Sequence, residues 1–219
     1  GNGYARIVLD TVNSFTPGAQ TGTITIGGEV KASNIRTAAT AFQLKIGQTV
    51  ASGTSTLGAN TTLNNTGGVV IGTAANAHTL SVTGSLATAN TGVVQVSGGV
   101  TTTTTQTYNA GVQLTGNASF TTTNSNVLFN STVDGTTANT ESLTIAAGTG
   151  NTTVTGAIGA SVALRNITIT SGALMAAAVK ADTGIAITNS AASTISGVIA
   201  GNANLTKAGA STLTLSGNN

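Results

Sequence analysis

The 219-residue sequence has no cysteine, no tryptophan, a single proline and a single histidine, His78. Without cysteine, a disulfide scaffold, a thiolate nucleophile and a thiolate metal site are all excluded. A single histidine also excludes the motifs in which two histidines bind one metal ion. Because proline is nearly absent, almost every backbone N–H can donate a hydrogen bond, as the central strands of a β-sheet require.

Charged residues are equally scarce, at 5% of the chain, with seven basic and five acidic side chains and a net charge of +2. Typical globular domains carry about 25% charged residues. The basic residues are scattered and never adjacent: Arg6, Lys31, Arg36, Lys45, Arg165, Lys180 and Lys207. Since nucleic-acid binding needs clustered positive charge, we expect no nucleic-acid partner.

Long apolar runs are missing as well. The longest run, at residues 173–179, stops at Lys180 and is far shorter than the ~18 residues of a membrane span, so we expect no span in this segment. The chain shows no start methionine, basic n-region or apolar h-region, and we interpret it as a piece of a longer protein. The absence of cysteine and the scarcity of lysine and glutamate favour an exported bacterial protein, extracellular or at the cell surface.

Short runs of alternating apolar and threonine residues extend from one end of the sequence to the other. Examples are residues 23–26, 80–82, 94–96, 143–145, 167–170, 185–187 and 213–215. Alternation with a period of two, rich in β-branched residues, is the signature of β-strands. Glycine, asparagine and serine separate the runs, as is usual in turns. Residues 35–46 are the only fair candidate for a helix.

The strands recur with a degenerate repeat of about two dozen residues. The motif at Phe129 returns at Val154, and the Leu-Thr pair at Leu143 returns as Ile-Thr at Ile167. A repeat of this length made only of strands and turns predicts an all-β fold, a parallel β-solenoid, whose stacked coils share one narrow core. At about 20–25 residues per coil the chain would form roughly nine to eleven coils and a rod ~45–55 Å long. An antiparallel sandwich or barrel is the alternative.

The C-terminal residues 201–219 resemble the autotransporter-associated β-strand repeat. The matching residues are Leu205, Lys207, Gly209, Leu213, Leu215, Gly217 and Asn218, and the sequence departs from the motif at Ser211, where a second glycine is usual. The stretch from Gln106 to Ile169 is similar to the repeats of filamentous-haemagglutinin-like surface proteins. The resemblance, which covers residues 106–219, implies a right-handed parallel β-helix, a single elongated domain, in a secreted or outer-membrane-tethered protein.

The chain is expected to have two regions. Residues 1–70 form an N-terminal β-rich segment, either a cap or irregular coils, and residues 71–219 form the β-helix coils. Turn asparagines are expected to stack in ladders that satisfy polar groups and fix the register of the coils. These asparagines are Asn64, Asn65, Asn124, Asn126, Asn202, Asn204, Asn218 and Asn219.

Residues able to carry chemistry are few. His78 has no acidic residue within 30 positions on either side, so we expect a surface or turn histidine rather than a general base. Asp134, Glu141 and Arg165 could stack on one face, but paired-carboxylate catalysis needs the acids about 5–9.5 Å apart, and we prefer to explain these residues as solvated turns with a stray ion pair. We therefore assign no catalytic, cofactor-binding or metal residue, expect no cofactor, and do not expect an enzyme.

The preferred hypothesis is a structural segment of a secreted bacterial surface protein: an adhesin stalk, a surface fibre or a surface-layer subunit. Neighbouring coils of the parent protein would be its partners, and solenoid ends without charged caps would also allow self-association into filaments.

The alternative is a solenoid that binds host glycan or ice through a flat Thr-rich face, since pairs such as Thr23/Thr25, Thr168/Thr170 and Thr212/Thr214 resemble the rows of ice-binding solenoids. The coil-to-coil spacing of these pairs is irregular, which disfavours a regular face. A polysaccharide-cleaving β-helix enzyme is the weakest hypothesis.

Overall fold

The structure, a computed structural model, describes residues 7–8, 14–15, 22–37, 39, 41–49, 52–89 and 92–219. Within these ranges every regular element is a β-strand, no helix occurs, and all strand pairs are parallel. The all-β, parallel part of the expected fold is therefore confirmed. The antiparallel sandwich or barrel is excluded for the described residues.

The strands form three parallel ladders. The first ladder contains β3 (Gly22–Ile26), β6 (Phe42–Ile46), β9 (Val69–Ile71), the first parts of β12 (Val94–Thr102) and β14 (Val112–Thr122), β16 (Val133–Gly135), the start of β21 (Val179–Asn189) and β23 (Ile199–Ala200). The second ladder contains β1 (Ile7–Val8), β4 (Val30–Ala32), β7 (Gly53–Leu57), β10 (His78–Val82), the later parts of β12 and β14, β17 (Leu143–Ala146), β19 (Leu164–Ser171), β21 and β24 (Asn204–Ala208).

These two ladders merge into one 15-stranded sheet, whereas the third ladder is separate. The third ladder is an eight-stranded sheet of β8 (Thr61–Leu63), β11 (Leu86–Thr88), β13 (Gln106–Tyr108), β15 (Val127–Phe129), β18 (Thr152–Val154), β20 (Leu174–Ala176), β22 (Ser193–Ile195) and β25 (Leu213–Leu215). β2 (Ser14–Phe15) and β5 (Asn34–Ile35) pair with each other.

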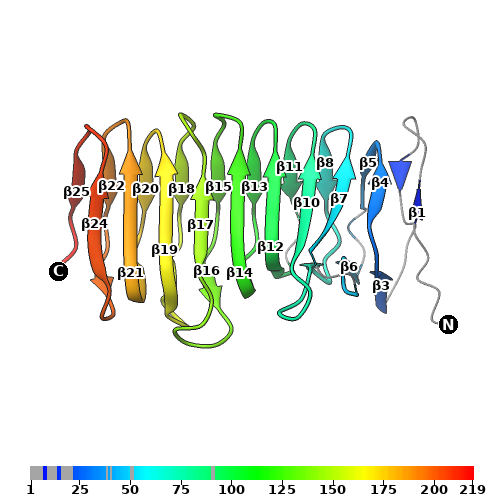
Figure 1. The fold of residues 1–219 in the computed structure, drawn as a ribbon, viewed down its shortest axis with the longest axis horizontal. Helices are drawn as coiled ribbons and strands as arrows, with labels where there is room; N and C mark the ends of the chain where they lie inside the picture. Colours follow the sequence, from blue (N-terminus) through cyan, green and yellow to red (C-terminus); the bar gives the residue numbers. More distant parts are fainter. Residues whose placement is uncertain are drawn as a thin grey trace.

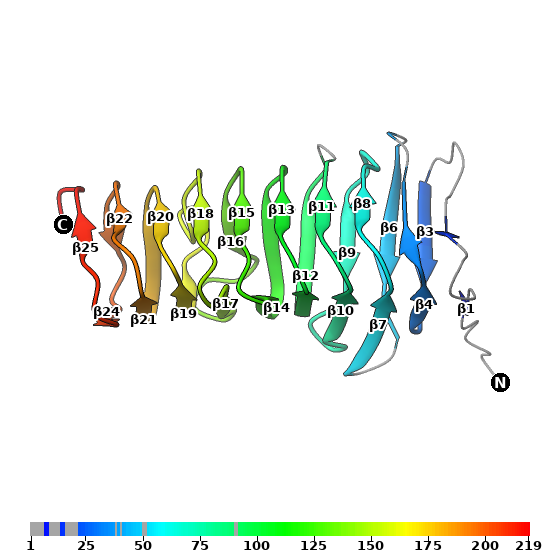
Figure 2. The ribbon, with the colours of Figure 1, turned by 90° about the horizontal axis from the view of Figure 1, so that it is seen from above.

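We call one pass of the chain through the ladders a rung, for example β14 followed by β15. Successive rungs stack in sequence order, and the long sheet runs through ten strands from β1 to β23. Figures 1 and 2 show the resulting elongated shape, with β1 near one end and β25 at the other. The ladders continue without interruption from β6 to β9 and from β7 to β10, across residue 70.

The repeat expected from the sequence corresponds to the interval between residues that pair on neighbouring strands of the ladders. Phe129 is paired with Val154 and Leu143 with Ile167, as the spacing of the motifs predicts. The length of a rung nevertheless varies. Leu44 pairs with Val69, whereas Val94 pairs with Val112, a clearly shorter interval of sequence. Loops between the strands absorb the difference.

Aliphatic side chains fill the space between the sheets because alternate residues of each strand point inward. In β6, Phe42, Leu44 and Ile46 are all fully buried, while Gln43 and Lys45 are only partly so. For the described residues, this period of two excludes the candidate helix at residues 35–46, because β5 ends at Ile35 and β6 occupies residues 42–46. Residues 38 and 40 lie outside the described residues.

Three aromatic rings form a cluster in the middle of the core. Tyr108 stacks on Phe129, with ring centroids 4.9 Å apart, and Phe120 meets both rings edge to face at 5.2 and 5.1 Å. The buried Tyr108 hydroxyl donates to Gln106 Oε1 at 2.9 Å. Gln106 Nε2 in turn donates to the carbonyls of Val100 and Thr121. The cluster joins the long sheet to the eight-stranded sheet, and its polar atoms are satisfied.

Asparagines connect rungs as expected, but mainly through the backbone rather than by amide stacking. Asn126 Oδ1 accepts from the backbone N–H of Asn151 at 2.9 Å, and Asn151 Oδ1 accepts from that of Ala173 at 2.9 Å. Asn124 makes the same bond to Thr149 N. Asn65 differs, because it is fully buried and its amide donates to the Phe42 carbonyl at 3.2 Å.

Replacing Phe129 with alanine should lower the free energy of unfolding by about 3–5 kcal/mol, because it leaves a cavity inside the aromatic cluster. The matched control is Leu128→Ala in the same strand, since Leu128 points outward and is only partly buried, so we expect a change below about 1 kcal/mol. Urea denaturation followed by circular dichroism measures both values. Equal losses for the two variants would contradict the assignment of the inward face.

Candidate functional site

His78 is a core residue and not the surface or turn histidine expected from the sequence. It opens β10, is 1% exposed, and its Nε2 lies 2.8 Å from Ser55 Oγ. Ser55 Oγ also accepts a hydrogen bond from the backbone N–H of Val30 at 2.9 Å. Gly47 packs against the imidazole so closely that a β-carbon there would lie 2.0 Å from the ring. The ring therefore occupies a slot that only a glycine at position 47 leaves open.

The other ring nitrogen of His78, Nδ1, is buried and has no hydrogen-bond partner among the described residues. Burial lowers the pKa of His78 below its ordinary 6.5, and the charge of Glu29 opposes that shift. Glu29 itself accepts a hydrogen bond from Thr54 N at 3.3 Å. A Ser–His pair with a nearby carboxylate has the residue types of a nucleophilic site, but Ser55 is 0% exposed, so no substrate reaches it.

Asp134, Glu141 and Arg165 do not form a shared acid–base site. Asp134 Oδ1 accepts from the backbone N–H of Ser161 at 2.9 Å and so links β16 to a loop of the next rung. Glu141 is 3% exposed and accepts hydrogen bonds from Thr136 Oγ1 at 2.5 Å and from Thr137 N at 3.2 Å. Arg165 contacts Glu141 through the backbone, where its N–H donates to the Glu141 carbonyl. Both carboxylates therefore hold loops.

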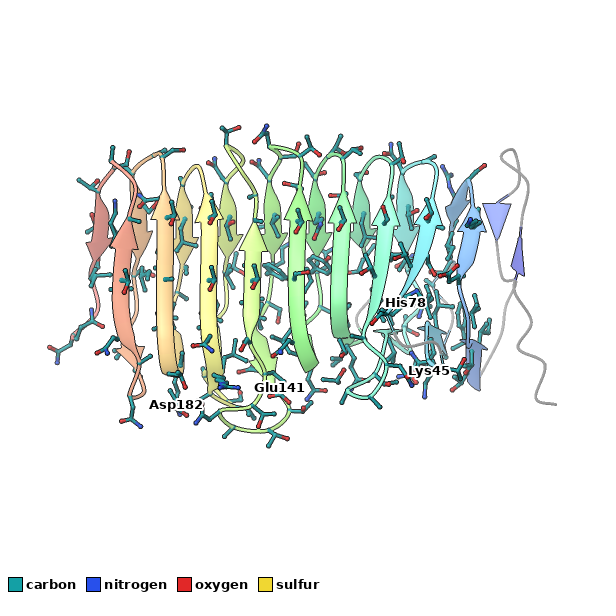
Figure 3. All side chains as sticks on the ribbon, viewed as in Figure 1. Lys45, His78, Glu141 and Asp182 are labelled. Atoms are coloured by element: carbon teal, nitrogen blue, oxygen red, sulfur yellow. The ribbon has the colours of Figure 1, made fainter. Side chains whose placement is uncertain are left out.

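The remaining ionisable residues are not gathered into a site either. Figure 3 shows Lys45, His78, Glu141 and Asp182 spread along the length of the rod. Among the described ranges, no group of three or more histidines and acidic residues could hold a metal ion. The same part of the chain contains no helix long and apolar enough to cross a membrane.

The second ladder carries an ordered outer surface that the sequence alone did not define. Two outward positions recur in each strand of the second ladder from β7 to β24, and the strand register aligns them in two columns. Column one contains Thr54, Thr79, Gly99, Ser119, Thr144, Thr168, Ala186 and Thr206, and column two contains Thr56, Ser81, Thr101, Thr121, Ala146, Thr170, Thr188 and Ala208. Twelve of the sixteen residues are threonine or serine. We call this surface the threonine face.

The hydroxyls of the threonine face are free of protein partners within the described residues. Threonines at the corners behave differently: Thr102 donates to the Thr104 carbonyl and Thr122 to the Ser125 carbonyl, each at 2.5 Å. Of the expected Thr-x-Thr pairs, only Thr168/Thr170 lies on this face. Thr23 and Thr25 belong to the first ladder and Thr214 to the third. The sequence alone does not show which threonines are register partners, because the rungs differ in length.

The opposite sheet is less regular. Its outward positions include Leu128 and Met175 among the threonines, and Met175 is 56% exposed. A hollow of about 380 Å³ adjoins Met175, between Thr153 and Thr194. This surface therefore lacks the uniform array of hydroxyls found on the threonine face.

Comparison of the chain with protein-family models, with curated proteins and with solved structures finds no match. The geometry of the chain itself must therefore support any functional assignment.

Acidification should destabilise the structure through His78. Because its pKa in the folded state is lowered, the unfolded chain binds a proton more readily below about pH 6.5. The stabilisation is thus complete above about pH 6.5 and declines as the pH falls through the lowered pKa, by at most about 1.4 kcal/mol per pH unit. Urea denaturation across this range tests the slope.

His78→Gln is the matched variant, since its amide can still bond Ser55 but does not titrate, and the slope due to His78 should disappear. Because His78 is the only histidine, its imidazole signals in NMR are unambiguous and report the pKa directly even if the variant folds poorly. A measured pKa at or above 6.5 would contradict the prediction.

Proposed function

We propose that the chain is a structural segment of a secreted bacterial cell-surface protein, an adhesin stalk, a surface fibre or part of a surface layer. The observation that carries this proposal is the unbroken stacking of parallel rungs from β3 to β25. Each rung adds ~4.8 Å of length, so the arrangement yields reach and stiffness rather than an enclosed site. We assign no catalytic residue and no cofactor.

We further propose that the rungs are coils of a right-handed parallel β-helix forming a single elongated domain. Parallel strands joined through a crossover are right-handed in about 98% of cases. In Figure 1 the near strands point upward, the chain crosses the top to the far sheet, and it advances toward β25. This direction of travel supports a right-handed coil.

The resemblance to autotransporter-associated repeats supports the surface role. The two halves of its motif occupy the two strands of the last rung: Leu205 and Lys207 lie in β24, and Leu213 and Leu215 lie in β25. Gly209, between them, has a φ of +84°, and a β-carbon there would lie 2.2 Å from the Asn189 carbonyl oxygen. The motif glycine therefore sits where only glycine fits.

The edge formed by β24 and β25 is where further rungs would attach. Leu205 and Leu213 are only partly buried there, and Leu215 is 40% exposed. Lys207 pairs with the inward Ile187 of the preceding rung, and its Nζ donates to the Gly209 carbonyl. Inward charges protect sheet edges from pairing with other chains. We propose that neighbouring rungs of the parent protein cover this edge and that self-association is the weaker use of it.

The threonine face supports a second candidate, a solenoid that binds a ligand through a flat surface. Its sixteen positions contain no charged and no aromatic residue. A structural stalk needs outward residues that are soluble and fit a sheet, which threonine satisfies, but it does not need them aligned in two columns.

Surface display tests the proposed role. The 219 residues, fused to the translocating β-barrel of an autotransporter in a Gram-negative host, should reach the cell surface and extend an N-terminal epitope away from it. Antibody labelling of intact cells measures export. The control Ile145→Asp, which buries an unpaired charge in the core, should fold poorly. Retention of the parent chain inside the cell, or images of a compact rather than rod-shaped particle, would contradict the proposal.

Removing the charge at the C-terminal edge should promote association of copies. We expect Lys207→Leu to show concentration-dependent sedimentation, because it exposes an apolar edge without its charge. Lys180→Leu is the control, since Lys180 points outward from β21 and borders no open edge. Analytical ultracentrifugation compares the two variants. Equal behaviour would show that Lys207 does not guard the edge.

A further inference from the structure

We propose that the threonine face binds ice, with its two columns of hydroxyl and methyl groups adsorbing to the ordered water lattice. This inference rests on the ligand-binding candidate for that face and not on the role of the rod in a surface protein. Four properties of the face support it: periodicity, rigidity, free hydroxyls and the absence of charge.

The face is periodic in two directions because a parallel sheet sets both spacings. Along the rod, equivalent residues such as Thr144 and Thr168 are direct register partners, which places them ~4.8 Å apart. Across the rod, the two columns are two residues apart on each strand, which corresponds to ~6.6 Å. The eight strands from β7 to β24 extend this grid over roughly 34 Å. A solid lattice can match such a grid, whereas a single small molecule would contact only part of it.

The face is also rigid. Every strand that carries it is hydrogen-bonded to strands on both sides, except β24 at the edge. Threonine is β-branched, so its χ1 is restricted before any ligand binds. Ordering the surface therefore costs little entropy on binding, and many weak contacts can form at once.

The chemistry of the face suits water better than sugar. The hydroxyls have no protein partner in the described part of the chain, so each can take a place in a network of water hydrogen bonds, and the adjacent methyl groups restrict the orientation of the water that covers them. Small-ligand sites are concave and contain aromatic and apolar walls. The threonine face contains no aromatic residue. A hollow of about 280 Å³ adjoins column one at Thr168, Ala186 and Thr206.

Charge bounds the face rather than interrupting it. Column two ends at Lys31 of β4, which pairs with Thr56. Within the columns the four residues other than threonine and serine are Gly99, Ala146, Ala186 and Ala208, all small and uncharged. Gly99 leaves space beside Thr79 and Ser119, whose hydroxyls would lie 3.0 and 3.4 Å from a β-carbon at that position. None of these residues projects above the array.

The test uses the full 219-residue chain and two matched lysine variants. Thr121→Lys places a long charged side chain in the middle of column two, whereas Thr107→Lys makes the same change at an outward position of β13 in the eight-stranded sheet. Circular dichroism and thermal melting verify that both variants fold. Thermal hysteresis, ice-crystal shaping and partitioning of labelled protein into growing ice measure binding.

We expect the unsubstituted chain and Thr107→Lys to shape ice and Thr121→Lys to lose this activity. An unsubstituted chain that neither shapes nor enters ice would overturn the proposal. Equal loss in Thr107→Lys would overturn the assignment to this face, and so would retention in Thr121→Lys. Binding to microcrystalline chitin or cellulose without ice binding would replace ice by a solid carbohydrate as the ligand. None of these outcomes affects surface display, so failure here is separable from failure of the structural role.

Discussion

The structure depends on backbone hydrogen bonds that run between rungs, along the axis of the rod. Val127 N donates to the Asn151 carbonyl and Thr152 N donates to the Ala173 carbonyl, so each rung is bonded to the next. A buried backbone group without a partner costs free energy comparable to a lost hydrogen bond. Each rung is therefore stabilised by the rungs that it is bonded to, which accounts for the scarcity of proline.

Parallel register aligns the inward positions of successive rungs, and likewise the outward positions. Each side chain therefore packs in a column with the side chains of the neighbouring rungs. Inside, the column that contains Leu80, Val100, Phe120 and Ile145 is part of the core. The aromatic cluster shows that such a core is not limited to slim aliphatic residues, provided the rings come from adjacent rungs. Outside, the same register produces the threonine face, which consists of two outward positions on each strand.

Local pattern was enough to predict the strands, their parallel arrangement and the repeat, because alternation and the spacing of Phe129 to Val154 are visible within one or two rungs. It failed at residues 42–46, where a short apolar-polar alternation was ambiguous between helix and strand. The burial of His78 could not be predicted, since its partners Ser55 and Gly47 belong to the preceding rung and are distant in the sequence. The threonine face needed the register itself, because rungs of unequal length hide it in the sequence.

The variable length of the rungs has a consequence for how such a chain can change over generations. Whether the interval between partners is short, as from Val94 to Val112, or long, as from Leu44 to Val69, the ladder advances by one strand. Loop insertions and deletions therefore remodel the flanks and leave the height of the stack untouched. The number of rungs, and not the number of residues, sets the length of the rod. The length of the rod and the chemistry of its surface can therefore evolve separately.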